Sequence, residues 1–309
     1  MLAFGALSPH KIKYRTLTWP YVAMIMTTEI VTGGTLTLPQ AIAVVGLVPG
    51  LIIIIFCGVL ALYTSFLLID FKLNHPEVHS MGDAGYILFK PFGLGAVGRE
   101  VLLNGTLLFA ITASGSMELL GAEALASLSD SKLCFVLYTG IFAVPTVLCA
   151  LPRTFGSGLS YLSVLACLSV LVACIVCMVG ASVSPTPDRI VVAARPQTFY
   201  TAFLAITNPV LAFCGHFMFF PLLSEMKNPR EAKKAAWCLQ TFSTIFYAVF
   251  AVVVYVYIGS EVSGTAFLSL TPKWAKAAWG IIIPNLLIAG SLYNHAAAKV
   301  CYAMPSSWN

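Results

Sequence analysis

The chain reads TEIVTGGTLTLP at residues 28–39, inside an apolar segment that runs from 21 to 45. Glycine and proline interrupt this segment between Thr32 and Pro39, although its length suits a membrane-spanning helix. Each backbone group freed by such an interruption costs several kcal/mol in hydrocarbon. A broken helix therefore persists only where protein or a water-filled cavity surrounds it, so we expect this one to line a functional site.

A second apolar segment, 200–223, is interrupted in the same manner, around Asn208-Pro209 and at FCGH, residues 213–216. Broken helices at corresponding positions of two halves are the sequence feature that best locates the binding site of a transporter. The ends of the half-helices present N–H groups to an anion and carbonyl groups to a cation. The two interruptions therefore predict a transporter whose binding site lies at the breaks.

Composition places the chain in a membrane. Of its 309 residues, 59% are hydrophobic and 9% are charged, whereas a soluble domain carries roughly 25% charge. We predict an all-α polytopic membrane protein with about eight spans, each of about 20 residues or more. The predicted spans are 21–45, 47–71, 97–126, 132–152, 157–182, 200–223, 235–258 and 277–300.

The 17 Lys and Arg residues lie between these spans or at their ends, so the net charge of +5 sets topology and does not indicate nucleic acid binding. Most of them fall on one side, and loops rich in Lys and Arg stay in the cytoplasm. We expect a cytoplasmic N-terminus, with no cleavable signal because a basic stretch precedes the first span. The richer side carries Lys11, Lys13, Arg15, Lys72, Lys90, Arg99, Arg153, Lys227, Arg230, Lys233, Lys234 and Lys299, and the other carries Lys132, Arg189, Arg195, Lys273 and Lys276.

Several stretches resemble the amino acid/auxin permease family, in particular its fungal branch of neutral amino acid permeases. The most specific is the block around the second break, where a broken helix is followed by an acidic-Met-Lys-x-Pro-Arg loop. The resemblance covers the chain from about 18 to 302. The stretches are TEIVTGGTLTLP (28–39), HPEVHSMGDAG (75–85), FCGHF (213–217), SEMKNPR (224–230) and HAAAK (295–299).

The resemblance implies a LeuT-like inverted-repeat fold of the APC superfamily, in which helices 1 and 6 are discontinuous. It divides the chain into a cytoplasmic tail (1–18), a transporter domain (19–302) and a short tail (303–309). Repeat one would occupy about 19–182 and a partial repeat two about 198–302. Members of the family have further spans, so we expect an incomplete second repeat, as in a truncated product or a degenerate member.

The resemblance also implies amino acid symport driven by protons or sodium, usually by protons in fungi. We expect a secondary active transporter that imports neutral amino acids by proton symport with alternating access, in the plasma membrane rather than the vacuolar membrane. The alternative is a truncated, non-transporting paralogue that acts as an amino acid sensor or regulatory subunit. Apart from the amino acid and the bilayer, we expect no cofactor and no protein or nucleic acid partner.

An intramembrane enzyme is disfavoured. A metalloprotease would need His-Glu-x-x-His, and an aspartyl protease would need paired intramembrane Asp residues. The sequence contains neither, so we expect no catalytic residues and no metal site.

The candidate substrate-binding residues lie at the two breaks. Glycines let the helix unwind and let a ligand approach the backbone, although a glycine pair also packs helices together. Threonine hydroxyls, including that of Thr37, serve either a ligand or their own helix. The candidates are Thr32, Gly33, Gly34, Thr35, Phe213, Cys214, Gly215 and His216.

The candidate coupling residues are polar groups within the spans. Glu29 is an intramembrane carboxylate, which is by default a functional group, with a structural hydrogen bond to the sixth or seventh span as the alternative. His216 titrates near physiological pH, unless it is only hydrogen-bonded within the bundle. Ser291 and Asn294 lie where the resemblance places oxygen ligands for a cation or a substituting proton group.

Other polar and aromatic residues have weaker assignments. Phe109, Thr112 and Ser114 either face the site or pack between helices. The loop charges Glu225, Lys227, Arg230 and Glu231 form a cytoplasmic gate or a solvated loop. Glu118 and Glu123 are expected near the outer end of the third span, with no assigned role.

Overall fold

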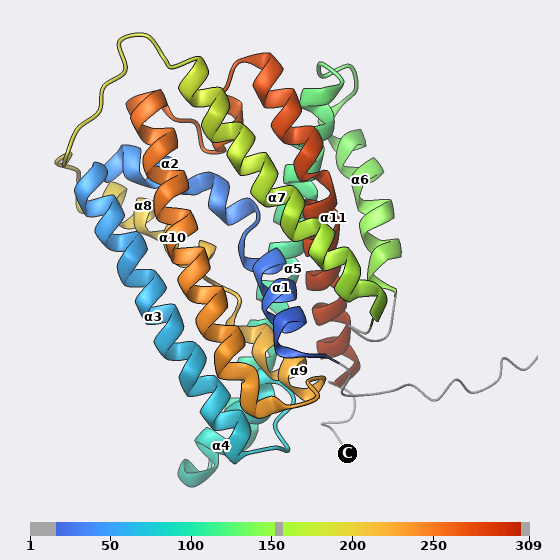
Figure 1. Cartoon of the computed structure of the whole chain (residues 1–309). Coiled ribbons are helices and arrows are strands. Elements are labelled where there is room, and N and C mark those ends of the chain that lie inside the picture. Colours follow the sequence, from blue (N-terminus) through green and yellow to red (C-terminus); the bar gives the residue numbers. More distant parts are fainter. Residues whose placement is uncertain (1–16, 152–156, 304–309) are drawn as a thin grey trace, which may run out of the picture.

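A computed structural model describes residues 17–151 and 157–303 (Figure 1). These residues form helices, and the only strand-like pairing among them is an isolated bridge between Leu17 and Met226. The α-helices are α1 (Trp19–Ile30), α2 (Gly33–Val45), α3 (Leu47–Asn74), α4 (Met81–Phe89), α5 (Gly95–Leu128), α6 (Phe135–Ala150), α7 (Ser157–Val183), α8 (Phe199–Ala212), α9 (Phe219–Ser224), α10 (Ala232–Ile258) and α11 (Pro272–Ala303). Short 3-10 helices occupy Lys90–Phe92, His216–Met218, Pro229–Glu231, Gly259–Glu261 and Ala266–Ser269.

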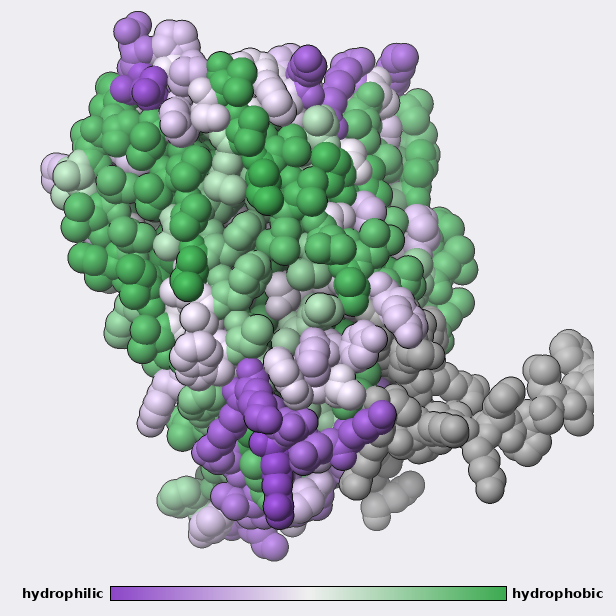
Figure 2. All heavy atoms as spheres, in the orientation of Figure 1, coloured by the Kyte–Doolittle hydropathy of each residue, from purple (hydrophilic) through white to green (hydrophobic). Residues whose placement is uncertain are grey.

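Six of the described helical stretches are long and apolar enough to cross a membrane: α3, α5, α7, α8 with α9, α10 and α11. Figure 2 shows hydrophobic side chains around the middle of the molecule and hydrophilic ones at its two ends. The chain is therefore an integral, multi-pass membrane protein. The two other predicted spans, 21–45 and 132–152, correspond to shorter helices, α1 with α2 and α6.

Both breaks are narrower than the sequence indicated. Val31–Thr32 alone separates α1 from α2, so Gly33 begins a helix and Pro39 lies inside it. Likewise Pro209 lies inside α8, and the chain leaves the helix only at 213–215. A proline removes one N–H donor, and within a bundle neighbouring groups satisfy the carbonyl that it frees. The prediction that Pro39 and Pro209 lie at the breaks was therefore wrong. Gly33 directly follows the first break, and Gly215 lies within the second.

The described basic residues gather at the two ends of the bundle. One end, called here the α4 end, contains α4 and α9 and lies at the bottom of Figure 1. There Lys233 pairs with Asp70 at 2.7 Å. At the opposite, far end, Lys276 pairs with Asp130 at 2.6 Å. Lys11, Lys13, Arg15 and Arg153 lie outside the described residues, as does the tail 304–309, and the cytoplasmic side remains a prediction from the charge bias.

The core lies around α10, which packs against α1, α2, α3 and α7. Tyr247, Phe250 and Val254 on this helix have no exposed surface. On the other side α11 packs along α5 and α7, with Trp279 fully buried. Both α10 and α11 pack against α1, so protein surrounds the backbone at the end of α1.

The short helix α4 lies across the end of the bundle. Ser80 and Asp83 form a capping box, in which Asp83 N donates to Ser80 Oγ and Ser80 N donates to the Asp83 carboxylate. The helix begins at Met81, where this cap satisfies its first donors. Pro91 does not stop the turn, since a 3-10 helix continues through Phe92.

Candidate functional site

The two breaks touch each other in the middle of the bundle. A Cβ built on Gly34 would lie 3.0 Å from Ala212 Cα, and one built on Gly215 would lie 2.6 Å from Ile30 Cγ1. The approach at Gly215 is closer than real Cβ contacts, and the approach at Gly34 is tighter than most of them, so a side chain at either position would require its neighbours to shift. The α2 and α8 helices pack together, and they meet at their broken ends, where Gly34 contacts Ala212.

Tyr247 of α10 holds both breaks at once. Its hydroxyl lies 2.7 Å from the carbonyl oxygen of Ile30 and 3.0 Å from that of Ala212, the last residues of α1 and α8. The hydroxyl donates to this pair of carbonyls, which are buried helix ends without helical partners. The Phe213 ring packs edge-on against Tyr247, with ring centroids 5.0 Å apart.

The other carbonyls at the end of α1 are satisfied by α11 and by the chain itself. Asn285 Nδ2 donates to Thr28 O at 3.2 Å, and Tyr293 Oη donates to Glu29 O at 3.3 Å. Val31 N donates to Thr27 O at 2.8 Å. The carbonyl side of this break is therefore engaged by protein donors.

The N–H side of the same break is open. Gly33 and Gly34 begin α2, where the first N–H groups have no helical acceptor, and neither donates to another described residue. They face a cavity of about 410 Å³, which we call the central pocket. The predicted residues that line it are Glu29, Thr32, Gly33, Gly34, Thr37, Phe109, Thr112 and Cys214. This arrangement suits an anionic group at the α2 N-terminus.

Glu29 lies at the wall of the central pocket with 1% of its surface exposed. Neither of its carboxylate oxygens has a hydrogen-bond partner among the described residues. The structural alternative, a side-chain hydrogen bond to the sixth or seventh span, is therefore not what the structure shows. A charged carboxylate in such a place requires a partner of opposite charge, whereas a protonated one does not.

Four other predicted residues lie near the breaks but do not line the central pocket: Thr35, Phe213, Gly215 and His216. Thr35 is buried within α2, and Gly215 packs against Ile30. His216 turns toward α3, with Nε2 at 3.0 Å from Ala61 O and 2.9 Å from Thr64 Oγ1. Because a carbonyl only accepts, this geometry assigns the proton to Nε2.

Ser291 and Asn294 of α11 are engaged with protein groups. Ser291 Oγ donates to Ile288 O within its own helix at 2.7 Å. Asn294 Oδ1 accepts from Ser114 Oγ of α5 at 2.7 Å. Only the bond of Asn294 joins α11 to another helix, and neither residue lines the central pocket.

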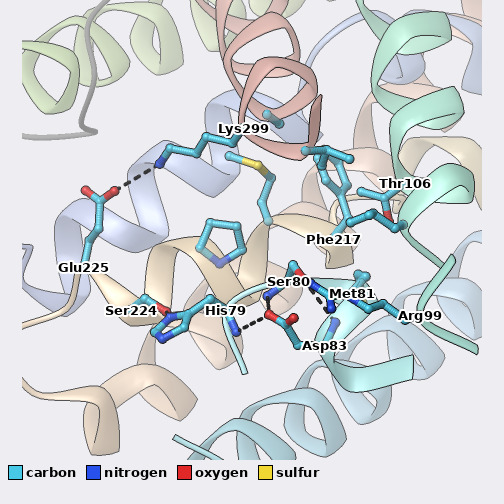
Figure 3. A pocket seen from close by; sticks show the side chains of 15 residues that line it. His79, Ser80, Met81, Asp83, Arg99, Thr106, Phe217, Ser224, Glu225 and Lys299 are labelled. Carbon is cyan, nitrogen blue, oxygen red and sulfur yellow. Dashed lines mark hydrogen bonds and ion pairs between the residues drawn. The ribbon is translucent and has the colours of Figure 1, made fainter. Parts of the chain in front are cut away.

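A second cavity of about 490 Å³ lies nearer the α4 end than the central pocket. Residues of α4, α5, α9 and α11 line it (Figure 3). We call it the α4 pocket. Phe109 and Tyr293 line the central pocket and Phe217 lines the α4 pocket, and these three rings contact one another with centroids 5.3 to 6.3 Å apart. An aromatic layer therefore separates the two cavities.

The charged residues predicted as a gate are divided between this pocket and the surface. Glu225 lines the α4 pocket and pairs with Lys299 at 3.3 Å. Glu231 pairs with Lys234 at 3.0 Å, and Lys227 and Arg230 are exposed.

At the far end, Glu123 accepts a long hydrogen bond of 3.4 Å from Thr265, and Glu118 lies near Gly290.

Sequence reasoning did not single out Tyr247, Asn285 and Tyr293, although they hold the first break together. The available signal was their polarity within the apolar spans 235–258 and 277–300, where polar groups need partners. Arg99 was counted only as a topology charge, whereas the structure places it in the wall of the α4 pocket.

The amino acid sequence matches a known protein family and several fungal and plant proteins. The family described as "Transmembrane amino acid transporter protein" matches residues 15–301. The "N amino acid transport system protein" of Neurospora crassa is 28% identical over 290 residues, which are 91% of this chain and 60% of that protein. A "Transmembrane transporter" of Fusarium pseudograminearum is 28% identical over 306 residues, covering 94% of this chain and 62% of that protein.

Similarity extends to plants. "Amino acid transporter AVT1D" of Arabidopsis thaliana is 29% identical over 254 residues, which are 78% of this chain and 44% of that protein. The chain thus spans about 60% of the length of the fungal relatives that it matches.

Proposed function

We propose a transport function for this chain, which belongs to the transmembrane amino acid transporter family and thus to no family of enzymes. The match agrees with the resemblance seen in the sequence. In our proposal the chain imports neutral amino acids together with protons and alternates access between its two ends. The observation that carries this proposal is the central pocket, which lies at the meeting point of the two broken helices beside a buried carboxyl group.

The substrate carboxylate would bind at the N-terminus of α2. The N–H groups of Gly33 and Gly34 lack protein acceptors there, and the positive end of the helix favours an anion. The remaining walls are largely apolar, with Met117, Leu120 and Leu211 among them. Among the described residues no Lys or Arg lines the pocket, which supports a neutral rather than an acidic side chain on the substrate.

Glu29 would carry the coupled proton. A substrate carboxylate at Gly33 and Gly34 and an ionised Glu29 would place two negative charges in one water-poor pocket, where repulsion is strong. Substrate and a proton on Glu29 therefore favour each other's binding, which is the linkage that symport requires. His216, turned toward Ala61, is the second candidate for a coupling role, and a sodium ion is the alternative coupling ion.

We also propose that 19–182 and 198–302 are inverted repeats of a LeuT-like fold. The first broken segment starts at the α4 end, where Leu17 pairs with Met226, and the second broken segment finishes at that end. The two breaks thus belong to antiparallel segments that touch at mid-height, the arrangement expected for inverted repeats. In this scheme the aromatic layer closes the central pocket on the α4 side.

The test is uptake of tritiated leucine by the full chain in liposomes, with and without an inward proton gradient. We expect gradient-driven uptake, and the Gly34→Leu variant should lose it because a side chain there meets Ala212. A folded protein that binds leucine and shows no uptake would instead favour the non-transporting sensor or regulatory subunit. A folded protein that neither binds nor transports neutral amino acids would overturn the proposal.

A further inference from the structure

We propose that the α4 pocket is a second amino acid site, which holds the zwitterion on its way between the central pocket and the α4 end. This inference rests on the proposed transport function. It assigns the substrate carboxylate to Arg99 and the substrate ammonium group to Asp83, both of which line this pocket. Figure 3 shows both side chains on the same part of the pocket wall.

Arg99 is the basic residue of this pocket whose side chain has no partner among the described residues. Its Nε is buried, and its guanidinium makes no hydrogen bond or ion pair with any described residue. By contrast, Lys299 on another wall of the pocket pairs with Glu225. An arginine fork matches a carboxylate with two parallel hydrogen bonds, so an α-carboxylate is a fitting partner.

Asp83 supplies the opposite charge close by. Its Oδ2 accepts from the backbone N–H groups of His79 and Ser80, both at 3.0 Å, and these bonds fix the carboxylate at the start of α4. Among the described residues Asp83 makes no ion pair, with Arg99 or with any other. A cation and an anion that share a cavity without pairing are suited to a ligand that carries both charges.

Close packing holds the two groups in place. A Cβ built on Gly85 would overlap Gly98 O, and one built on Gly82 would lie 3.0 Å from Leu103 Cδ1. Glycines thus let α4 press against the first turns of α5, so Asp83 and Arg99 keep a fixed relation. A binding site built on two such locked helices is already organised before its ligand arrives.

The other walls fit an uncharged side chain. Leu103, Met218 and Val300 give the pocket an apolar surface, and its volume of about 490 Å³ is in the range of small-molecule sites. Phe217 is the ring of the aromatic layer that lines this pocket, so an amino acid that passes Phe109 and Tyr293 arrives here. The pocket therefore continues the path from the central pocket.

The experiment counts leucine sites on the full chain in nanodiscs of phosphatidylcholine. Tritiated leucine is titrated onto the wild type, Gly34→Leu, Arg99→Gln and the double variant. We expect two molecules per chain for the wild type, one for each single variant and none for the double variant. Asp83→Asn keeps the helix cap but loses the charge, and should weaken the second site about tenfold or more.

Arg195→Gln, a change of the same chemistry at the far end, is the matched control and should keep both leucine sites. Two sites that survive in Arg99→Gln would overturn this inference while leaving the central site intact. Conversely, two sites that survive in Gly34→Leu would contradict the central site and hence the proposed function. The two failures are thus distinguishable, and thermal unfolding shows that each variant is folded.

A lipid headgroup is the other ligand that an arginine of this kind would attract. We therefore repeat the titration in nanodiscs that contain phosphatidylglycerol. For an amino acid site, leucine binding at Arg99 should remain in both lipids. Stabilisation by phosphatidylglycerol that Arg99→Gln abolishes, with no leucine site lost by that variant, would show a lipid site and overturn the inference.

Discussion

The two breaks differ in how their backbones are satisfied. At the first, between α1 and α2, the freed carbonyls accept hydrogen bonds from Tyr247, Asn285 and Tyr293, which lie on helices far along the chain. At the second, short turns do most of this work, since Cys214 N donates to Leu211 O and Met218 N donates to Gly215 O. The first break therefore depends on tertiary structure, and the second is largely local.

This difference also separates the two breaks by role. The first break has an open N-terminus at Gly33 and a buried carboxyl group at Glu29, both at the central pocket. The second contributes Cys214 to the same pocket but turns His216 away to α3. We infer that the first break binds substrate and proton, whereas the second mainly provides the surface against which the first is held.

The largest effect is expected at the contact between the breaks. Gly34→Leu introduces a side chain where a Cβ already lies 3.0 Å from Ala212 Cα, so α2 must move away from α8 and the central pocket is distorted. Leucine binding at the central site and uptake should both be lost. Gly115→Leu is the matched control, because nothing lies within 4 Å of a Cβ there, and it should behave as wild type.

Glu29→Gln tests whether the first break carries the proton. The amide has nearly the same shape but cannot gain or lose a proton, so uptake should no longer respond to the proton gradient, while exchange of leucine across the membrane persists. Counterflow of tritiated leucine measures that exchange. Glu118→Gln in α5 is the control and should stay coupled, and coupling that survives in Glu29→Gln would move this role elsewhere.

Tyr247→Phe tests the shared support of both breaks. The ring is retained, but Ala212 O loses its side-chain donor and Ile30 O keeps only the N–H of Thr32. A buried carbonyl left without a partner costs about 1–3 kcal/mol. The midpoint of thermal unfolding should fall, and leucine affinity should fall with it. Tyr257→Phe on the same helix should change neither, since its hydroxyl supports no helix end. Equal stability of the two variants would contradict the bridging role.

The sequence was sufficient for the features that depend on local chemistry. Glycines within apolar segments of spanning length were enough to predict the breaks and the helical membrane fold, because both follow from the cost of free backbone groups in hydrocarbon. The prolines were misread, since Pro39 and Pro209 are tolerated inside helices by neighbours that the sequence does not reveal. The limits of the breaks are thus a tertiary property.

The site was predictable only where residues are close to a break. Glu29, Gly33 and Gly34 were identified because they are adjacent in the chain and polar or flexible in an apolar span. Tyr247 and Arg99 are far from the breaks along the sequence, and the place of each beside a break or a pocket depends on which helices pack together. No periodicity or motif encodes that packing, and the contacts of α4 with α5 and of α10 with α1 had to be seen.

The smallest effect is expected for His216→Gln. Glutamine keeps an N–H donor that can reach Ala61 O, so we expect a loss of about 1 kcal/mol or less in stability and unchanged leucine affinity. Uptake driven by the proton gradient should also persist, because the side chain faces α3 and not the central pocket. If this variant uncoupled uptake while Glu29→Gln did not, the second break would be the coupling element. The division of roles would then be reversed, with the local break responding to protons and the tertiary one only binding substrate.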